Sequence, residues 1–322
     1  MPQVRGSDVV IGIGKETTFG QLPGTPDGKI LPVVKFGLMK KQNRVQSKTL
    51  RASRGKQRSM LGNIDHSGSI DIELNAESTG MLFEQLMGTV AHSGAGPYTH
   101  TYTIGALPPG LWIDEDFGSA LSGSGRYQRH NGVRISEATF TLNNEGPCDV
   151  SFSCVGVDVT AQAAPADATL TDNGFLAFSG FDAVIMDNAV TQSNIKSGTI
   201  KISNNLETDK YAFGGAGKRR TIPEGFAEVT GSITCYFEDL TLINKASSNT
   251  SSNLKVTFSR GNGLGTVNNE SIELFVQNLD YTPIIPEVSG AGGVEVTFDF
   301  IGFASGVNLG LQIIVKNAIA TF

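Results

Sequence analysis

The chain has 322 residues, of which 39 are Gly and 12 are Pro, while charged residues make up only 17%. Soluble domains average roughly 25% charged residues, so Ser, Thr, Asn and Gly must cover much of this surface, which favours strands joined by many turns. A hydrophobic share of 39% can form two modest cores, so disorder of the whole chain is disfavoured and the length predicts two domains.

The net charge of −6 disfavours a sequence-specific reader of nucleic acid, since the molecule as a whole should repel phosphates. Cys148, Cys154 and Cys235 lack C-x-x-C spacing, so they predict neither a disulfide framework nor a zinc site and fit a reducing compartment. The apolar residues 9–13 are too few for a signal peptide, and no run approaches the roughly 18 residues of a membrane helix. We therefore expect a chain made and kept in a cytosol, away from membranes.

A strongly basic segment, residues 40–58, contains no Asp or Glu and few apolar residues, so we expect it to be mobile in an isolated subunit. The rest of the chain carries 17 basic residues against 31 acidic ones. Three surroundings are open for the segment: the acidic body of another copy, a nucleic acid, or solvent alone. The nucleic-acid alternative is weakened because no aromatic residues are interleaved with the charges to stack on bases. Its basic residues define a first arm at about 40–66: Lys40, Lys41, Arg44, Lys48, Arg51, Arg54, Lys56 and Arg58.

After the first arm, residues 70–74 alternate apolar and acidic side chains, which predicts a strand with Ile70, Ile72 and Leu74 toward a core. Ser78 or Thr79 then caps a helix that runs to residue 87 and ends at a glycine. Further strands are predicted at 133–142, 148–155, 199–203, 254–258, 272–276 and 294–301, with a weaker helix signal near 240–243. Residues 161–173 are typical of a linker.

An internal repeat organises these elements. A basic cluster followed by Gly-Ser-Ile occurs at 56–70 and again at 218–233, and the form V-[ST]-F-x-x-[VI]-G occurs at 150–156 and 296–302. The shared order favours duplication over chance similarity of short strand motifs. We therefore expect a mainly β chain with two tandem antiparallel β-sandwich or barrel domains, 1–165 and 166–322, each with a short helix and a loop arm. The second arm, about 206–229, is shorter, and its basic residues are Lys218, Arg219 and Arg220.

The sequence offers no constellation for catalysis. Gly217-Lys218 is followed by Arg219 instead of Ser or Thr, so the phosphate-loop motif fails. The four histidines have no metal-ligand spacing and are predicted to be polar loop residues. No G-x-S-x-G elbow is present. We therefore expect no enzyme, no cofactor and no metal, and we expect Trp112 to anchor a core or an interface.

Four runs carry a family likeness: GKETTFG at 14–20, LPGTP at 22–26, LPPGLWID at 107–114 and NGVRI at 131–135. With the basic arm and the Gly-Ser-Ile strand in the same order, the chain resembles major tail tube proteins of long non-contractile-tailed bacteriophages (siphophages) over most of its length. The resemblance implies a β-sandwich whose inner sheet joins those of its neighbours into a barrel around a DNA-conducting lumen. It also implies an extended loop that docks on the adjacent ring and, in members with a doubled domain, three chains in a ring of six domains.

This resemblance further implies a structural virion protein of the tail, assembled in the bacterial cytoplasm, with the tape-measure protein, the distal tail protein and the tail terminator as partners. Phage DNA would pass without specific binding, because an acidic lumen releases no counterions onto Lys or Arg. Candidates for that lining are acidic residues facing away from the core, namely Glu137, Glu295 and Asp299. The alternative is a two-domain β-sandwich adhesin or carbohydrate-binding module on a virion, which would use exposed aromatic side chains.

Overall fold

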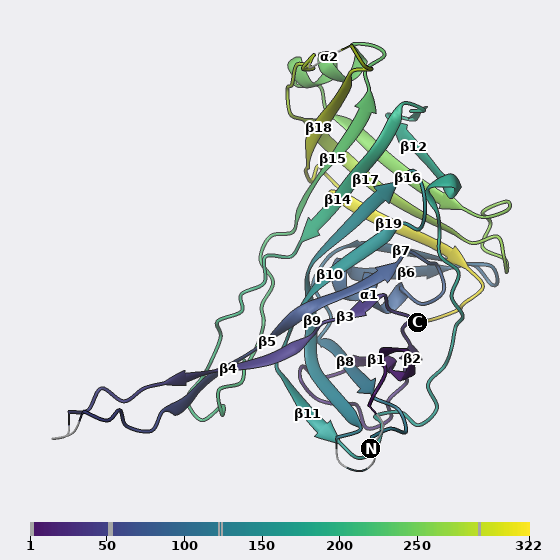
Figure 1. The fold of residues 1–322 in the computed structure, drawn as a ribbon. Coiled ribbons are helices and arrows are strands. Elements are labelled where there is room, and N and C mark those ends of the chain that lie inside the picture. The colour runs from purple at the N-terminus through teal and green to yellow at the C-terminus, as the bar shows by residue number, and fades with distance from the viewer. Residues whose placement is uncertain (1–2, 51–53, 122, 124, 289–290) are drawn as a thin grey trace.

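The computed structural model describes residues 3–50, 54–121, 123, 125–288 and 291–322. Within this part of the chain, nineteen strands and two α-helices are present, and every ladder between named strands is antiparallel. The molecule is elongated, with the first half of the chain at one end, the second half at the other and a hairpin projecting from one side (Figure 1). The mainly β class expected from the sequence is confirmed.

The first half folds into two antiparallel layers that share one long strand. One layer has the order β2 (Lys29–Ile30), β1 (Val10–Glu16), β8 (Gly110–Asp116), β9 (Tyr127–Asn143) and β11 (Asp158–Gln162). In the other layer, β3 (Lys35–Phe36) and β4 (Met39–Val45) pair with one side of β5 (Met60–Glu73). The other side of β5 pairs with β10 (Asp149–Gly156), and β10 pairs in turn with the last part of β9. Helix α1 (Gly80–Met87) fills the core, where Phe83 packs against Phe140 and Phe152.

The second half repeats this strand pairing. One layer has the order β13 (Val190–Thr191), β12 (Ala183–Asp187), β16 (Ser252–Ser259), β17 (Ser271–Tyr281) and β19 (Leu311–Asn317). The other contains β14 (Ile195–Ser203), β15 (Glu228–Tyr236), β18 (Glu295–Gly302) and the end of β17, and α2 (Thr241–Ser247) follows β15. Register shifts fall at equivalent points, between Leu111 and Ile113 on β8 and between Ser252 and Leu254 on β16. The strands β8, β9 and β10 therefore correspond to β16, β17 and β18.

The two halves differ in one inserted hairpin. Strands β6 (Gly88–Ser93) and β7 (Tyr98–Ile104) follow α1, whereas α2 leads directly into β16. β7 pairs with β19, and this ladder brings the fully buried Tyr102 opposite the fully buried Ile313. An element of the first half thus completes a layer of the second half, and the two cores become continuous.

A second connection between the halves is the pairing of β9 with β14, in which Thr141 lies opposite Thr199. This pairing creates one sheet with the order β5–β10–β9–β14–β15–β18, visible in Figure 1 as the strands that run along the body. We call it the central sheet. We call the pairing of β9 with β14 the internal junction.

The repeated Gly-Ser-Ile motif has a steric origin at its glycine. A Cβ atom at Gly68 would lie 2.1 Å from the carbonyl oxygen of Gly37, and one at Gly231 would lie 2.2 Å from that of Thr199. Any side chain would therefore push the neighbouring strand away. The isoleucine two residues later is fully buried in both copies, so the phase predicted from the alternation is confirmed.

The other sequence predictions of structure largely hold. All six predicted later strands fall within or overlap observed strands, and the predicted first helix is α1, which ends at Gly88 with a positive φ of 96°. The three cysteines are free and buried, and Trp112 is fully buried in the core. Residues 163–179 connect the halves without a regular strand or α-helix, close to the predicted linker.

Candidate assembly surfaces

One face of the central sheet is polar along its whole width. Side chains alternate between the core and this face, as in β10, where Val150 and Phe152 are buried while Asp149, Ser151 and Ser153 point the other way. Cross-strand pairing aligns the outward residues in rows. One row contains Glu73, Asp149, Thr141, Thr199, Ser232 and Asp299, and the next contains Asp71, Ser151, Thr139, Lys201, Thr230 and Ile301.

The structure brings the three predicted lining residues to this polar face. Glu137 lies on β9, while Glu295 and Asp299 lie on β18, and all three point away from the core. Two of them are paired: Glu137 with Lys201 at 2.8 Å and Glu295 with Lys196 at 2.8 Å. Among the described residues, no ion pair within 4.0 Å involves Glu73, Asp149, Glu228 or Asp299 on the same face. The face is therefore mostly Ser and Thr with a surplus of carboxylates, which gives it a negative potential.

The central sheet ends in two unpartnered edges. At one end, the outer side of β3 and β4 exposes Val34 (66%) and Met39 (56%). At the other end, β17 pairs with β18 as far as Tyr281, the Thr282 N–H bonds to the Asp299 carbonyl at 2.8 Å, and residues 283–288 follow without regular structure. This segment exposes Ile285 (85%) and Val288 (73%). Open edges with apolar side chains promote pairing with another chain.

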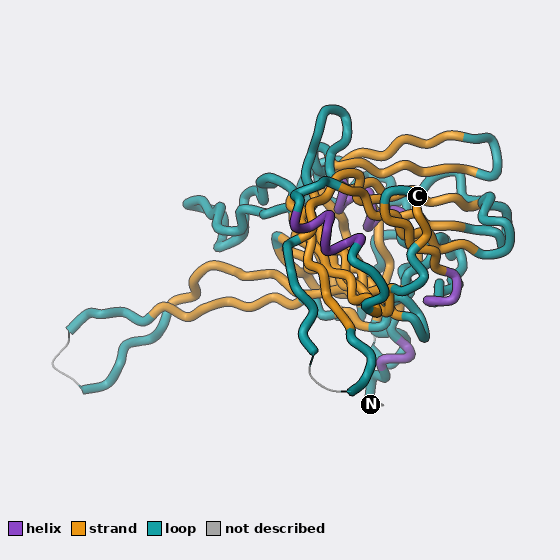
Figure 2. Tube along the Cα trace, turned by 90° about the horizontal axis from the view of Figure 1, so that it is seen from above, coloured by secondary structure: helices purple, strands orange, loops and turns teal. Residues whose placement is uncertain are grey.

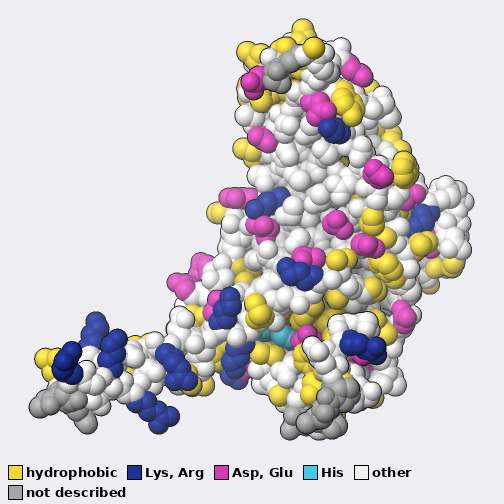
Figure 3. Space-filling view, in the orientation of Figure 1, with side chains coloured by type: hydrophobic (Ala, Val, Ile, Leu, Met, Phe, Trp, Pro, Cys, Tyr) yellow, Lys and Arg dark blue, Asp and Glu magenta, His cyan; other side chains and the backbone are white. Residues whose placement is uncertain are grey.

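The first arm projects far from the body as a β-hairpin formed by β4 and the start of β5 (Figures 1 and 2). The expectation that residues 40–58 cannot order themselves is wrong for residues 40–45, which lie in β4, because the far end of the partner strand β5 is anchored in the central sheet and templates the ladder. Arg51 lies outside the described residues. The basic side chains gather on the projecting hairpin in Figure 3. Those exposed in the described part are Lys40, Lys41, Arg44, Lys48, Arg54, Lys56 and Arg58.

Lys40 differs from the other cations of the first arm because it belongs to the base of the hairpin. Its Nζ lies 2.6 Å from the buried carboxylate of Asp158 on β11, and Lys218 of the second arm binds the other oxygen at 2.8 Å. Burial alone would raise the pKa of Asp158, but hydrogen bonds from Lys218 and Lys40 hold it below its usual range. Lys40 and Lys218 therefore stabilise the root of the first arm within the chain.

The second arm folds onto the base of the first arm. The Arg219 side chain is 6% exposed and donates hydrogen bonds to the carbonyls of His66, Gly156 and Thr208 at 3.2, 3.1 and 2.7 Å. Its remaining nitrogen binds Asp65 at 2.6 Å, and this hydrogen bond lowers the pKa of Asp65. Lys218 and Arg219 thus contact their own chain, whereas Arg220 is exposed.

The prediction that the histidines are polar loop residues is wrong, because all four lie in strands and only His92, in β6, is exposed. His66, His100 and His130 are buried in strands β5, β7 and β9, where at least one ring nitrogen of each has a polar partner inside the protein. His66 Nε2 lies 2.9 Å from His130 Nδ1, and His100 Nε2 lies 3.0 Å from the Asn317 side-chain oxygen. Burial, aided by the neighbouring His130, lowers the pKa of His66 to about 3. The part of the chain that the structure describes contains no cluster of His, Cys, Asp and Glu that could hold a metal ion.

Two features of these surfaces were not found from the sequence. The internal junction and the burial of Arg219 both join residues more than fifty positions apart, and a strand pattern does not specify its partner strand. A signal for Arg219 existed in its position between glycines, where the backbone can approach another segment closely: Ile64 N–H bonds to Gly217 O at 2.8 Å. The basic residues on either side of Arg219 favoured the interpretation of an arm that acts through its charge.

An antiparallel β protein with a one-sided polar sheet, two open sheet edges and a projecting basic hairpin has the features of a structural subunit that assembles with further copies. Residues 6–302 match the family model of the phage tail tube protein. The chain therefore belongs to the phage tail tube protein family, as the resemblance in its sequence indicated, and its place is the virion tail. No curated protein matches the chain. Among the described residues, neither helix has the length and apolarity to cross a bilayer.

Proposed function

We propose that this protein polymerises into stacked rings that form the tube of a siphophage tail, and that the tube conducts the genome during ejection. Residues 1–165 and 166–322 act as two copies of one tube domain. Three chains then supply six domains to each ring. The tape-measure protein, the distal tail protein and the tail terminator are the further partners in this proposal.

The observation that carries the proposal is the internal junction. The last part of β9 pairs with β14 inside one chain, and the equivalent edges at the two ends of the central sheet remain open. A ring closes when the end beside β18 of one chain meets the β3–β4 edge of the next in the same manner. Such head-to-tail contacts use two different surfaces and generate closed rings when the rotation matches.

The polar face of the central sheet supports its role as the lining of the lumen. A closed sheet has one face inside and one outside, and the opposite face here is buried against the core. The surplus carboxylates repel DNA phosphates, and the two lysines near the middle are paired with Glu137 and Glu295. DNA therefore gains no counterion release on contact and slides without binding.

The first arm supports the stacking of rings. It carries the exposed cations of the hairpin well outside the body, while the remainder of the chain is acidic overall. Opposite charges on the arm and on the adjacent ring attract, and the contact forms only on assembly.

Negative-stain electron microscopy of the purified protein tests this function. Long hollow filaments of constant width are the expected result, with a striation whose spacing matches one ring. Uniform monomers across a range of concentrations, salt and crowding agents would contradict the proposal and would favour a virion adhesin.

A further inference from the structure

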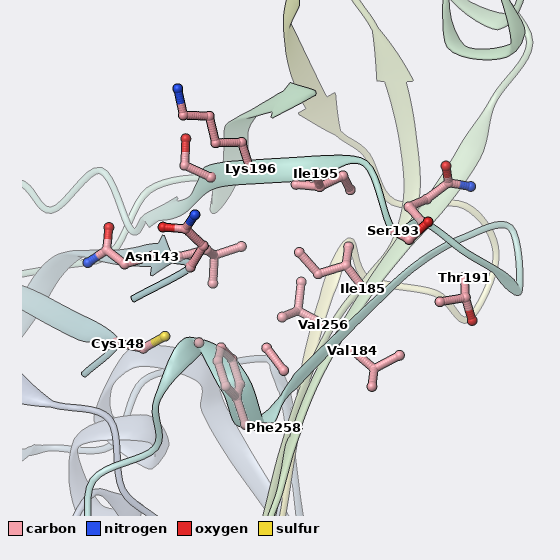
Figure 4. A pocket seen from close by; sticks show the side chains of 16 residues that line it. Asn143, Cys148, Val184, Ile185, Thr191, Ser193, Ile195, Lys196, Val256 and Phe258 are labelled. Carbon is pink, nitrogen blue, oxygen red and sulfur yellow. The ribbon is translucent and has the colours of Figure 1, made fainter. Parts of the chain in front are cut away.

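The internal junction contains a pocket of about 300 Å³ between the two halves (Figure 4). Leu142 and Asn143 at the end of β9 and Cys148 just before β10 form one wall of it. The facing wall comes from the start of the second half, including Ile185 and Ile195. Leu142 is only 5% exposed and Cys148 only 2%, so the two residues that flank the turn are buried.

Backbone contacts fasten this turn to the start of the second half. Cys148 N–H bonds to the Phe178 carbonyl at 3.0 Å, and Gly180 N–H bonds to the Gly146 carbonyl at 3.2 Å. A Cβ atom at Gly180 would lie 2.1 Å from the Asn143 carbonyl oxygen. Position 180 therefore requires glycine because the turn approaches it so closely.

The start of the first half has the same local structure. Asp8 N–H bonds to the Arg5 carbonyl at 3.0 Å, as Asp182 N–H bonds to that of Ser179 at 3.0 Å. Leu31 N–H bonds to the Ile11 carbonyl at 2.9 Å, as Gln192 N–H bonds to that of Ile185 at 2.9 Å. These matched contacts make Gly6 the equivalent of Gly180 and Ile11 the equivalent of Ile185.

The equivalent place in the first half is a larger, unfilled pocket of about 620 Å³. Gly6, Val10, Ile11 and Phe36 line it, and residues 172–175 of the connection form part of its rim. A Cβ atom at Gly6 would meet no atom of the described residues within 4 Å. Gly6 therefore sits where Gly180 sits, without the turn that makes glycine necessary there. We call this pocket the socket.

The segment that would fill the socket is exposed at the far end of the central sheet. β17 pairs with β18 only as far as Tyr281, and continuing its correspondence with β9 along the sequence puts Val288 in the place of Leu142; Val288 is 73% exposed instead of 5%. Ile285 likewise takes the place of Thr139, which in the internal junction lies opposite Lys201. Lys201 corresponds to Met39, so two exposed apolar side chains, Met39 and Ile285, would face each other.

We propose that the socket of one chain receives residues 282–288 and the start of β18 from a second copy, so that the junction between chains repeats the internal junction. Val288 then enters the socket, and Ile285 packs on Met39. Pro283 and Pro286 reduce the ladder hydrogen bonds of this edge, so side-chain fit in the socket supplies much of the specificity. This inference rests on the proposed self-assembly and names the surfaces that perform it.

Substitution of Gly6 tests the socket. Gly6→Leu has room in the isolated chain and should keep the melting temperature of the wild-type monomer, yet its side chain should occupy part of the socket that Val288 enters. The expected result is a critical concentration for polymerisation raised more than about tenfold. Gly24→Leu is the matched control, since a Cβ there also meets nothing within 4 Å among the described residues. Polymerisation of Gly6→Leu at the wild-type concentration would overturn the inference, whereas failure of the wild type to polymerise would overturn the proposed function instead.

A disulfide test reports the register directly. The native cysteines are buried, so a double variant Met39→Cys with Ile285→Cys should form bonds only between chains under mild oxidation. Non-reducing gels of polymerised protein should show a ladder of linked chains. Met39→Cys with Val307→Cys is the mismatched control, since Val307 is 93% exposed and lies outside residues 282–288. Monomer bands alone from the polymerised Met39–Ile285 pair would show that the junction uses other residues.

Discussion

Arg219 is the side chain that fastens the second arm to the first half of the chain. Its guanidinium satisfies two carbonyls of the first half, His66 and Gly156, that would otherwise lie buried beside it. An arginine suits this place because its five N–H donors point in fixed directions and it stays charged at all relevant pH values. Its role is structural, although its sequence context suggested an arm that acts through exposed charge.

Replacing Arg219 with Met should lower the free energy of unfolding by about 2–3 kcal/mol, because hydrogen bonds to a charged donor are lost and buried carbonyls are left without partners. Urea denaturation followed by circular dichroism measures the change. Arg220→Met is the control, since the neighbouring side chain is exposed and should leave the midpoint unchanged. Equal midpoints for the two variants would show that the buried contacts contribute nothing to stability.

At the level of elements, the sequence was most informative about burial within a single strand. There, the alternation of the strand's own residues decides which side chains face the core. The alternation in 70–74 correctly predicted which side chains enter the core. It could not give the β6–β7 hairpin, whose Thr- and His-rich strands are stabilised by pairing with β19 more than two hundred residues later. Composition also did not predict that part of the first arm forms a regular strand. Anchoring of β5 in the central sheet outweighs the lack of apolar residues in β4.

The hairpin conformation of the first arm leads to a prediction about stacking. Reversing Lys48 and Arg54 to Glu should leave the monomer folded, because both are exposed, and should abolish filaments by repelling the acidic body of the next ring. Lys210→Glu with Arg220→Glu reverses the same number of exposed charges on the second arm and should still polymerise. Electron microscopy and sedimentation measure the outcome, and filaments formed equally by both variants would refute docking through the charges of the first arm.

At the level of the whole molecule, the polar face shows which parts of a candidate functional surface can be predicted from the sequence. Glu295 and Asp299 could be assigned to an outward phase because they alternate with buried neighbours, and Glu137 because it precedes the buried Ala138. Their placement on a single sheet could not be predicted, since it depends on the pairing of β9 with β14. The neutralising lysines 196 and 201 were missed for the same reason.

The polar face predicts that added positive charge will make the tube retain DNA. The triple variant Glu73→Lys, Asp149→Lys and Asp299→Lys should still polymerise, because all three side chains point away from the core. A fluorescent duplex present during polymerisation should then co-sediment with the tubes, and the retained fraction should fall steeply between about 50 and 200 mM salt.

The matched control reverses three exposed acidic residues outside the polar face, Asp27, Asp209 and Glu238. Tubes of this control have the same net charge and should retain as little duplex as the wild type. If the control retains DNA equally well, the polar face does not line the channel.

Because β9 and β14 belong to one polypeptide, their pairing affects how the proposed ring assembles and how it withstands strain. That junction is made when the chain folds, so it adds nothing to the translational and rotational entropy lost when subunits meet. In the ring proposed above, every second seam is therefore already formed before the subunits meet. Complete separation of neighbouring repeats requires opening of a seam between polypeptides, and a ring of such chains always holds an even number of repeats.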